Sequence, residues 1–172
     1  MKKRLHFHLL ALSYKIRDLR RPRRIILEEV EIKPGDRVLD FGCGPGSYLL
    51  LLVEMVGPHG KIYALDINPL AIRMVQGLAE RKQLKNISTI HSDGPTGLPD
   101  DYLDVVLLFD VFHHLEQPQA VLRELHRILR PGGILSVSDH HLKGSQIIQA
   151  LTEGNLFKLS KTGRFTYSFN KI

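Results

Sequence analysis

The sequence predicts an α/β fold in which a doubly wound, mainly parallel sheet carries helices on both faces. Short apolar segments alternate with amphipathic ones along residues 37–151, which is typical of strands joined by crossover helices. A glycine-rich loop directly follows the first apolar segment. Of the 172 residues, 43% are hydrophobic and 24% are charged, a globular composition that excludes a disordered or collagen-like chain. We expect a single domain over residues 1–172.

The parallel strands are predicted by five apolar segments, at residues 37–41, 61–65, 87–91, 104–109 and 134–138. The fourth segment contains an unbroken Val-Val-Leu-Leu-Phe run, which suits a central strand that is covered on both faces. Crossover connections between such strands are right-handed, so their helices cover the two faces of one sheet.

Helices are expected between these strands. Residues 47–56 predict a buried helix, and Asn68 followed by Pro69 is typical of the N-cap and first turn of the next one. Residues 119–130 are amphipathic and predict a helix whose charged residues face solvent, ended by a Pro-Gly-Gly sequence. Those charged residues are Arg123, Glu124 and Arg127.

A hairpin is expected at the end of the chain, after a short helix at 145–151. Segments 157–160 and 164–169 flank Thr162-Gly163, which predicts a turn between two strands. The hairpin adds an antiparallel strand at one edge of the sheet and brings the expected total to seven strands. In such sheets ligands bind beyond the carboxyl ends of the strands, near the switch in strand order.

Positive charge is concentrated near the N-terminus, where the first 24 positions hold nine basic residues and one acidic residue. We expect residues 1–34 to form a basic helical lid over a core of residues 35–172. Such a segment attracts phosphates or an anionic membrane surface. A solvated helix whose arginines pair with local acids is favoured over that interpretation, because no RNA-binding signature accompanies the charge.

The cellular setting is expected to be cytoplasmic. A single cysteine, Cys43, excludes an intrachain disulfide and suits a reducing compartment. The basic start of the chain and the apolar residues after it are faintly typical of a signal peptide, but His6 and His8 interrupt them and no small-residue cleavage site follows. Apolar runs such as residues 49–53 are far shorter than the roughly 20 residues that cross a bilayer. We therefore expect no membrane span.

The glycine loop predicts a binding site for a nucleotide-like ligand. Gly42, Gly44 and Gly46 alternate after the first strand, so the backbone turns sharply and a ligand can lie against it. The helix that follows presents free N–H groups to an anionic group. Asp66 ends the second strand, 20 positions after Gly46, where an acid binds ribose hydroxyls in nucleotide-binding sheets.

Two cofactor classes compete for this loop. A dinucleotide fingerprint places its third glycine at position 47, where this chain has Ser47. Asp40, just before the loop, would repel a pyrophosphate and attract a ligand with an amino group or a sulfonium. The charge therefore favours S-adenosylmethionine over NAD, and a glycine turn without any ligand is the remaining alternative.

Taken together, these motifs resemble class I S-adenosylmethionine-dependent methyltransferases. Residues 38–46 are similar to the first motif of that family, residues 64–69 to the second, and residues 92–94 to the segment that contacts adenine. Residues 104–133 resemble the ubiquinone and menaquinone-type (type 11) branch. The resemblance covers about residues 35–138. It implies a Rossmann-like fold, S-adenosyl-L-methionine as cofactor, and a hairpin strand that lies antiparallel between its neighbours.

The resemblance also implies roles for single residues. The glycine loop and Asp40 would hold the methionine part, and Asp66 would bind the ribose with Ile67 packed on adenine. Asp93 would accept a hydrogen bond from the adenine amino group, and Asp110 would face the methionyl amino group or the substrate. The expected cofactor-binding residues are Asp40, Gly42, Gly44, Gly46, Asp66, Ile67, Asp93, Gly94 and Asp110.

Histidines are the candidates for a general base, which is needed only when the acceptor atom carries a proton. His113 and His114 follow the fourth strand, and His140 and His141 follow the fifth. If the chain stays extended there, adjacent side chains point opposite ways, so at most one of each pair faces the site. We expect His113 and His140 to be the catalytic residues.

A metal-assisted reaction is an alternative at the same place. Asp110, Asp139 and His140 resemble the metal ligands of catechol-type O-methyltransferases, where a divalent ion acts as a Lewis acid on a substrate oxygen. The sequence as a whole is more similar to the branch without a metal, and it has no tight Cys/His spacing. We therefore expect no bound metal.

The expected acceptor is a small molecule, aromatic or lipid-like, because few residues are added to the core and those are basic and apolar. Two alternatives remain open. One is an RNA or protein methyltransferase that uses the basic arm, and the other is a cofactor-binding module without catalytic activity. A dinucleotide oxidoreductase is less favoured than either.

Overall fold

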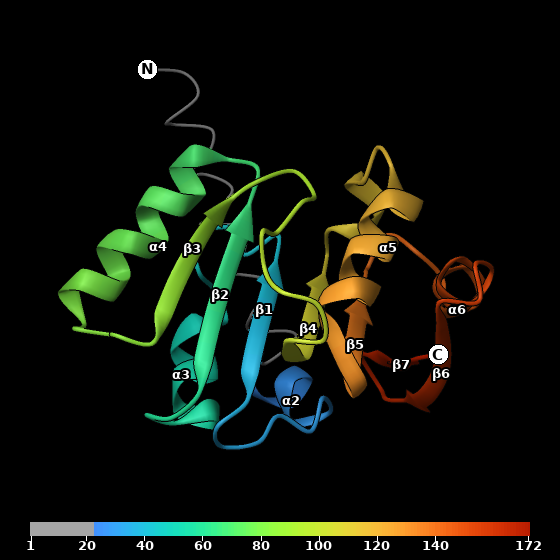
Figure 1. Cartoon of the computed structure of the whole chain (residues 1–172), viewed down its shortest axis with the longest axis horizontal. Coiled ribbons are helices and arrows are strands. Elements are labelled where there is room, and N and C mark those ends of the chain that lie inside the picture. Colours follow the sequence, from blue (N-terminus) through green and yellow to red (C-terminus); the bar gives the residue numbers. More distant parts are fainter. Residues whose placement is uncertain (1–22) are drawn as a thin grey trace.

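All seven expected strands are present in the computed structural model, which describes residues 23–172 (Figure 1). They are β1 (Arg37–Phe41), β2 (Lys61–Asp66), β3 (Ile87–His91), β4 (Leu103–Phe109), β5 (Leu129–Ser138), β6 (Phe157–Thr162) and β7 (Tyr167–Lys171). They form one sheet in the order β3-β2-β1-β4-β5-β7-β6. β1 to β5 are parallel, and β7 is antiparallel to both of its neighbours. The predicted fold class is therefore confirmed.

Helices cover both faces of this sheet, as the alternation predicted. One face packs against α2 (Arg23–Glu28), α3 (Leu49–Val56) and α4 (Pro69–Arg81), and the other against α5 (Pro118–Ile128) and α6 (Gly144–Thr152). β4 shows the two sides directly, because Val105 and Leu107 belong to the first core and Val106 and Leu108 to the second. Asn68 caps α4 as predicted, accepting the Leu70 N–H at 2.9 Å.

The predicted hairpin is present, but its turn was placed wrongly. β6 continues through Thr162 and β7 begins only at Tyr167, so the turn spans residues 163–166. The carboxylate of Glu29 accepts the backbone N–H groups of Arg164, Phe165 and Thr166, each at 3.0 Å. These three N–H groups therefore bond to Glu29 and not to the neighbouring strand. A contact across 135 positions of sequence cannot be read from local turn signals.

α5 ends two residues earlier than predicted. The chain leaves the helix at Ile128, and Leu129 already pairs with Leu103 of β4. The Pro-Gly-Gly sequence at 131–133 therefore lies inside β5 and does not end the helix. Strand pairing with β4 stops this helix before its breaker residues are reached.

The predicted lid lies mostly outside the described residues. Of its 34 positions, residues 23–34 are described, and Ile26, Leu27 and Val30 are buried in the core on the α3 side. Glu29 fastens the same segment to the hairpin turn. A lid formed by residues 1–22 stays a prediction. Among the described helices, none has both the length and the apolar character that a membrane crossing requires.

Residues 92–102, which connect β3 to β4, contain no helix (Figure 1). This loop crosses the same side of the sheet as α5. Its residue Tyr102 reaches Tyr63 of β2, with the two hydroxyl oxygens 2.9 Å apart. The sheet beside α5 is thus covered by a loop where a crossover helix would otherwise pack.

Candidate functional site

A cavity of about 910 Å³ opens at the carboxyl ends of β1, β2 and β4, where a doubly wound sheet is expected to bind its ligand. Its wall combines the glycine loop, the ends of β2 and β3, and α5. A volume of this size suits a cofactor together with a small acceptor. Seven of the nine residues predicted to bind the cofactor line it, namely Gly42, Gly44, Asp66, Ile67, Asp93, Gly94 and Asp110.

The three glycines of the loop have different surroundings. All have positive φ, at 79° for Gly42, 53° for Gly44 and 84° for Gly46. A Cβ on Gly42 would come within 2.7 Å of Val111, and one on Gly46 within 2.7 Å of Leu49. At Gly44 nothing lies within 4 Å, so a side chain there would project into the cavity. Gly46 therefore serves helix packing, while Gly44 faces the ligand space.

Asp66 organises the loop from the end of β2. Its Oδ2 accepts the Gly44 N–H and its Oδ1 accepts the Asn68 N–H, both at 2.8 Å. Each carboxylate oxygen can accept a second hydrogen bond, so the group remains available to a ligand in the cavity. Ile67 beside it is 67% exposed, which gives the cavity an apolar surface next to the carboxylate.

Asp40 lies in a second, small cavity of about 50 Å³ that Gly42, Gly44, Tyr48 and Asp110 also line. The carboxyl group is buried, and its Oδ2 has no hydrogen-bond partner within residues 23–172. Burial, reinforced by the charge of Asp66, raises the pKa of Asp40 to about 7. A buried acceptor without a donor is costly, so a cationic or donor group that reaches this oxygen would be stabilised there.

The charged face of α5 is exposed at Arg123, as predicted, but its Glu124 side chain is largely covered, with 18% exposed. Arg123, Glu124 and Arg127 line the cavity. Glu124 accepts hydrogen bonds from both the backbone and the hydroxyl of Thr96, and from Arg127. These bonds, with that from Arg127 the strongest, lower the pKa of Glu124 to about 2. Glu124 thus fastens α5 to the loop that follows β3. The sequence shows that the three residues share one helix face, but it does not show that the loop containing Thr96 packs against that face.

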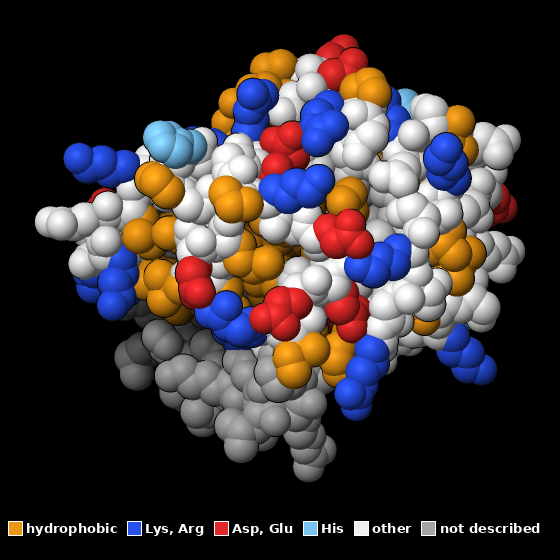
Figure 2. All heavy atoms as spheres, turned by 90° about the horizontal axis from the view of Figure 1, so that it is seen from below, with side chains coloured by type: hydrophobic (Ala, Val, Ile, Leu, Met, Phe, Trp, Pro, Cys, Tyr) orange, Lys and Arg blue, Asp and Glu red, His pale blue; other side chains and the backbone are white. Residues whose placement is uncertain are grey.

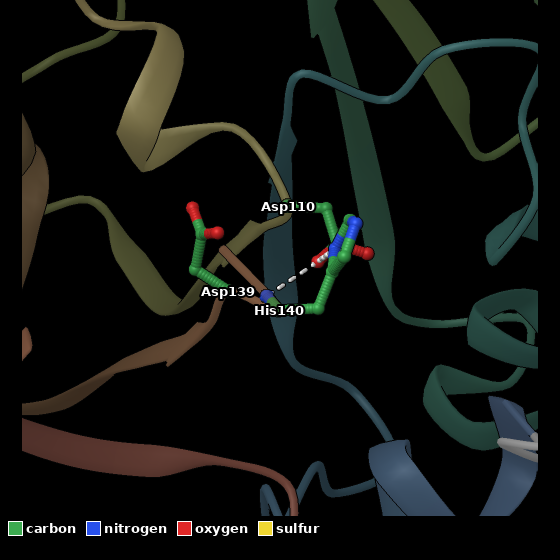
Figure 3. Close-up of side chains that lie close together, drawn as sticks. All are labelled: Asp110, Asp139 and His140. Carbon is green, nitrogen blue, oxygen red and sulfur yellow. Dashed lines mark hydrogen bonds and ion pairs between the residues drawn. The ribbon is translucent and has the colours of Figure 1, made fainter. Parts of the chain in front are cut away.

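Histidines and carboxylates gather where β4 and β5 end (Figure 3). Phe109 pairs with Ser138, so Asp110 and Asp139 follow at neighbouring strand ends. His140 Nδ1 lies 2.6 Å from Asp110 Oδ1, and His113 Nδ1 lies 2.7 Å from Asp139 Oδ2. The cluster brings together Asp110, His113, His114, Asp139, His140 and His141.

The geometry of the histidine pairs differs from the extended one on which their selection rested. Residues 112–114 form a 3₁₀ turn, and the rings of His113 and His114 lie 3.9 Å apart. The rings of His140 and His141 are also 3.9 Å apart. His114 lines the large cavity, whereas His113 lies deeper, with 15% of its side chain exposed. His114, a candidate that was not selected, is therefore the histidine of the first pair that lines the cavity, and neither selected histidine, His113 or His140, lines it.

Electrostatics in this cluster keep the carboxylate of Asp139 charged. Burial acts to raise the pKa of Asp139, but hydrogen bonds from the His113 ring and from the backbone N–H groups of His141 and His113 outweigh it, so the pKa is lowered. Desolvation, followed by the neighbouring charges of His140 and His113, lowers the pKa of His141. At neutral pH the Asp139 carboxylate is therefore ionised, and the His141 imidazole beside it is neutral.

Comparison with known proteins relates this chain to methyltransferases. A family model described as a methyltransferase domain matches residues 32–169. The demethylmenaquinone methyltransferase of Geobacillus stearothermophilus is 29% identical over 113 residues, which cover 65% of this chain and 48% of that protein. The chain thus spans about half the length of the curated relatives that it matches.

Solved structures share this fold, and one of them is a methyltransferase. The crystal structure of a SAM-dependent methyltransferase from Aquifex aeolicus superposes with a TM-score of 0.76 at 25% identity, covering 87% of this chain and 88% of that one. The [4+2]-cyclase SpnF superposes with a TM-score of 0.72 at 19% identity, covering 82% of this chain and 58% of that one. The second likeness concerns the fold alone, and it illustrates that one fold can support more than one reaction.

Proposed function

The chain belongs to the methyltransferase domain family, and on that premise we propose that it transfers a methyl group from S-adenosylmethionine to a small organic acceptor. The observation that carries the proposal is the large cavity, because its wall joins the glycine loop, Asp66 and Asp93 in one place. The distant similarity to demethylmenaquinone methyltransferases supports the same reaction class.

The methionine end of the cofactor fits the small cavity beside Asp40. Within residues 23–172 the buried Oδ2 of Asp40 has no hydrogen-bond partner, and a cationic amino group would both donate to it and offset its charge. Asp110 lines the same space and adds a second carboxylate. A pyrophosphate would meet repulsion from both groups, so the donor set favours a cationic ligand over a dinucleotide.

The adenosine end fits the large cavity. Asp66 retains acceptor capacity for ribose hydroxyls, and the exposed Ile67 offers an apolar surface for a flat ring. Asp93 and Gly94 line the far side, and the Ser92 hydroxyl accepts the Gly94 N–H at 3.2 Å, which orders that loop. These residues would orient the nucleoside while the glycine loop lies along it.

When bound, S-adenosylmethionine supplies an activated methyl group, so the protein mainly aligns the acceptor and excludes water. Each predicted base has a carboxylate at its Nδ1, namely Asp139 for His113 and Asp110 for His140. This contact favours the tautomer that leaves Nε2 free to accept a proton. His140 is the more accessible of the two, with 37% of its side chain exposed.

A small, ring-bearing or lipid-like acceptor is supported by the lining of the cavity. Leu115, Ala120 and Val121 give its α5 side an apolar surface. The Geobacillus stearothermophilus relative is named a demethylmenaquinone methyltransferase, which agrees with a small organic acceptor. Apolar walls with a few polar groups are the usual lining of a small-molecule site.

A macromolecular acceptor is the second candidate, and its only support is the basic N-terminal segment. Residues 23–172 carry 17 basic and 17 acidic side chains, so the described part of the chain is neutral. Figure 2 shows the side where the parallel strands begin, with acidic and basic groups interspersed. This face therefore lacks the concentration of one sign of charge that an RNA-binding surface would show.

Labelled methyl transfer tests the proposal. The protein would be incubated with S-adenosylmethionine carrying a labelled methyl group and with separate small-molecule, RNA and protein fractions of a cell extract. We expect label in an organic-extractable small product. Label confined to RNA or protein would support the macromolecular alternative, and tight cofactor binding without any labelled product would support the inactive module.

A further inference from the structure

We propose that Arg23 is a positioning residue for the cofactor, because its guanidinium holds the segment between the glycine loop and α3 against the small cavity. Nη1 of Arg23 donates to the Ser47 carbonyl oxygen at 2.6 Å. The guanidinium carbon lies 5.7 Å from the centre of the Tyr48 ring, within the range of a cation–π contact. The inference rests on the proposed use of S-adenosylmethionine, and Arg23 acts through Ser47 and Tyr48 without touching the cofactor.

Both residues that Arg23 contacts belong to the wall of the small cavity. Ser47 and Tyr48 line this space together with Asp40. Tyr48 is 8% exposed, and its ring meets that of Phe109 edge-on, with the ring centres 5.4 Å apart. Phe109 ends β4 and lines the same cavity. The position of Arg23 therefore affects the shape of the cavity through two neighbours that already form its wall.

Arginine can make both of these contacts at once. Its planar guanidinium offers several N–H donors and a flat face that stacks on an aromatic ring, whereas the ammonium of lysine is a compact, strongly hydrated charge. A hydrogen bond from a charged donor is about twice as strong as one between neutral groups. The bond to Ser47 is also partly buried, so water competes less with it than at an open surface.

The segment that carries Arg23 is fixed to the rest of the protein. Ile26, Leu27 and Val30 are buried in the core on the α3 side. Glu29 accepts three backbone N–H groups of the hairpin turn. Arg23 thus projects from a backbone that is held on two sides, and its guanidinium has a defined place beside the glycine loop.

The charge of Arg23 also acts on Asp40. The ionisable groups around the Asp40 carboxyl are Cys43 in the loop, Tyr48 before α3, Asp66 at the end of β2, Asp110 after β4, and Arg23 itself. Burial raises the pKa of the Cys43 thiol, so this group is neutral. Burial and the charge of Asp66 raise the pKa of Asp40 to about 7, and the positive charge of Arg23 acts in the opposite direction. Arg23 therefore favours the ionised carboxylate that a cationic amino group would meet.

Titration of Asp40 in the cofactor-free protein tests this effect of the charge. The midpoint is followed by the ¹³C NMR signal of the Asp40 carboxyl, which is identified by its loss in Asp40→Asn. We expect a higher midpoint in Arg23→Gln, which lacks the charge, and a midpoint close to that of the parent in Arg23→Lys, which keeps it. Arg24→Gln is the matched control, because Arg24 is the next residue of α2, pairs with Glu54 at an exposed position and does not line the cavity. Its midpoint should equal that of the parent.

Calorimetric titration with S-adenosylmethionine at pH 7 tests the positioning. Arg23→Gln should weaken binding by roughly fivefold or more, Arg23→Lys should weaken it less, and Arg24→Gln should bind like the parent. Thermal melting verifies that the variants are folded. An unchanged affinity or an unchanged Asp40 midpoint in Arg23→Gln would overturn the proposal, and so would equal losses of affinity in Arg23→Gln and Arg24→Gln. Absence of binding in the parent would instead contradict the proposed function, and the cofactor-free titration would still decide whether Arg23 acts on Asp40.

Discussion

The carboxylate of Asp66 accepts the backbone N–H of Gly44 at 2.8 Å, so the acid at the end of β2 holds the ligand-facing glycine of the loop after β1. The other oxygen of the same carboxylate accepts the Asn68 N–H and fixes the start of α4. The Asp66 side chain therefore fixes both the glycine loop and the start of α4, and its remaining acceptor capacity faces the cavity.

Changing Asp66 to Asn should weaken S-adenosylmethionine binding by about 1–3 kcal/mol, because an acceptor at the cavity is replaced by a donor. Calorimetric titration measures the dissociation constant. Asp36→Asn is the matched control, since Asp36 also accepts a backbone N–H, that of Lys33 at 2.8 Å, in a turn away from the cavity. Equal affinities in the parent and Asp66→Asn would remove Asp66 from the proposed site.

The pKa of Asp40, about 7, predicts a pH-dependent affinity for the cationic cofactor. The carboxyl group is mostly neutral at pH 6 and mostly charged at pH 8, so binding should tighten about tenfold between those values. Asp40→Asn should bind more weakly at pH 8 and should lose the pH dependence. If the cofactor affinity of Asp40→Asn still changes with pH, another group must cause the pH dependence.

The same carboxyl group predicts an unusual effect on stability. A folded pKa raised from 3.8 to about 7 means that the contribution of Asp40 is fully present below pH 4 and is lost as the pH rises through 7. Asp40→Asn should therefore raise the free energy of unfolding at pH 8 by as much as about 4 kcal/mol, and by little at pH 4. Urea unfolding at both pH values measures the difference.

Replacement of the loop glycines by alanine should separate binding from folding. Gly44→Ala should weaken cofactor binding more than tenfold, because its Cβ would enter the cavity, while strain at φ 53° costs about 1–2 kcal/mol of stability. Gly35→Ala is the control, since Gly35 has φ 92° and open space around it but lies outside the cavity. Gly35→Ala should be less stable than the parent but should bind the cofactor with the same affinity. Equal affinity losses in both variants would indicate a general loosening of the fold.

The lowered pKa of Glu124, about 2, predicts that its contribution to stability is present above pH 4.5 and disappears as the pH falls through 2. Glu124→Gln should lower the free energy of unfolding at pH 7 by roughly 1–3 kcal/mol, a range reduced for the solvent screening of the partly exposed Arg127. The deficit should shrink toward pH 2. Glu80→Gln, at an exposed position on α4, should change stability little at either pH.

Local sequence patterns predict the order of strands and helices and the glycine loop with its acid, while the reaction class comes from the resemblance of those motifs to a known family. Those features follow from local rules, since strand segments show in apolar runs, Asn68-Pro69 starts a helix, and tight turns require glycine. β3 begins and ends as predicted, and the Asn68 cap is confirmed by its hydrogen bond. Patterns that depend on a few neighbouring residues can be recognised from the sequence alone.

Which distant residues meet depends on the folded arrangement of the strands and helices. Glu29 displaced the hairpin turn, strand pairing ended α5 early, and a loop packed on α5 turned Glu124 from an expected surface residue into part of the cavity wall. The β4–β5 register joined Asp110 with Asp139, and a turn after β4 brought His114 to the cavity. Apart from the turn after β4, each of these contacts spans tens of residues or more along the chain, so its outcome depends on how the strands pair and pack rather than on any local pattern.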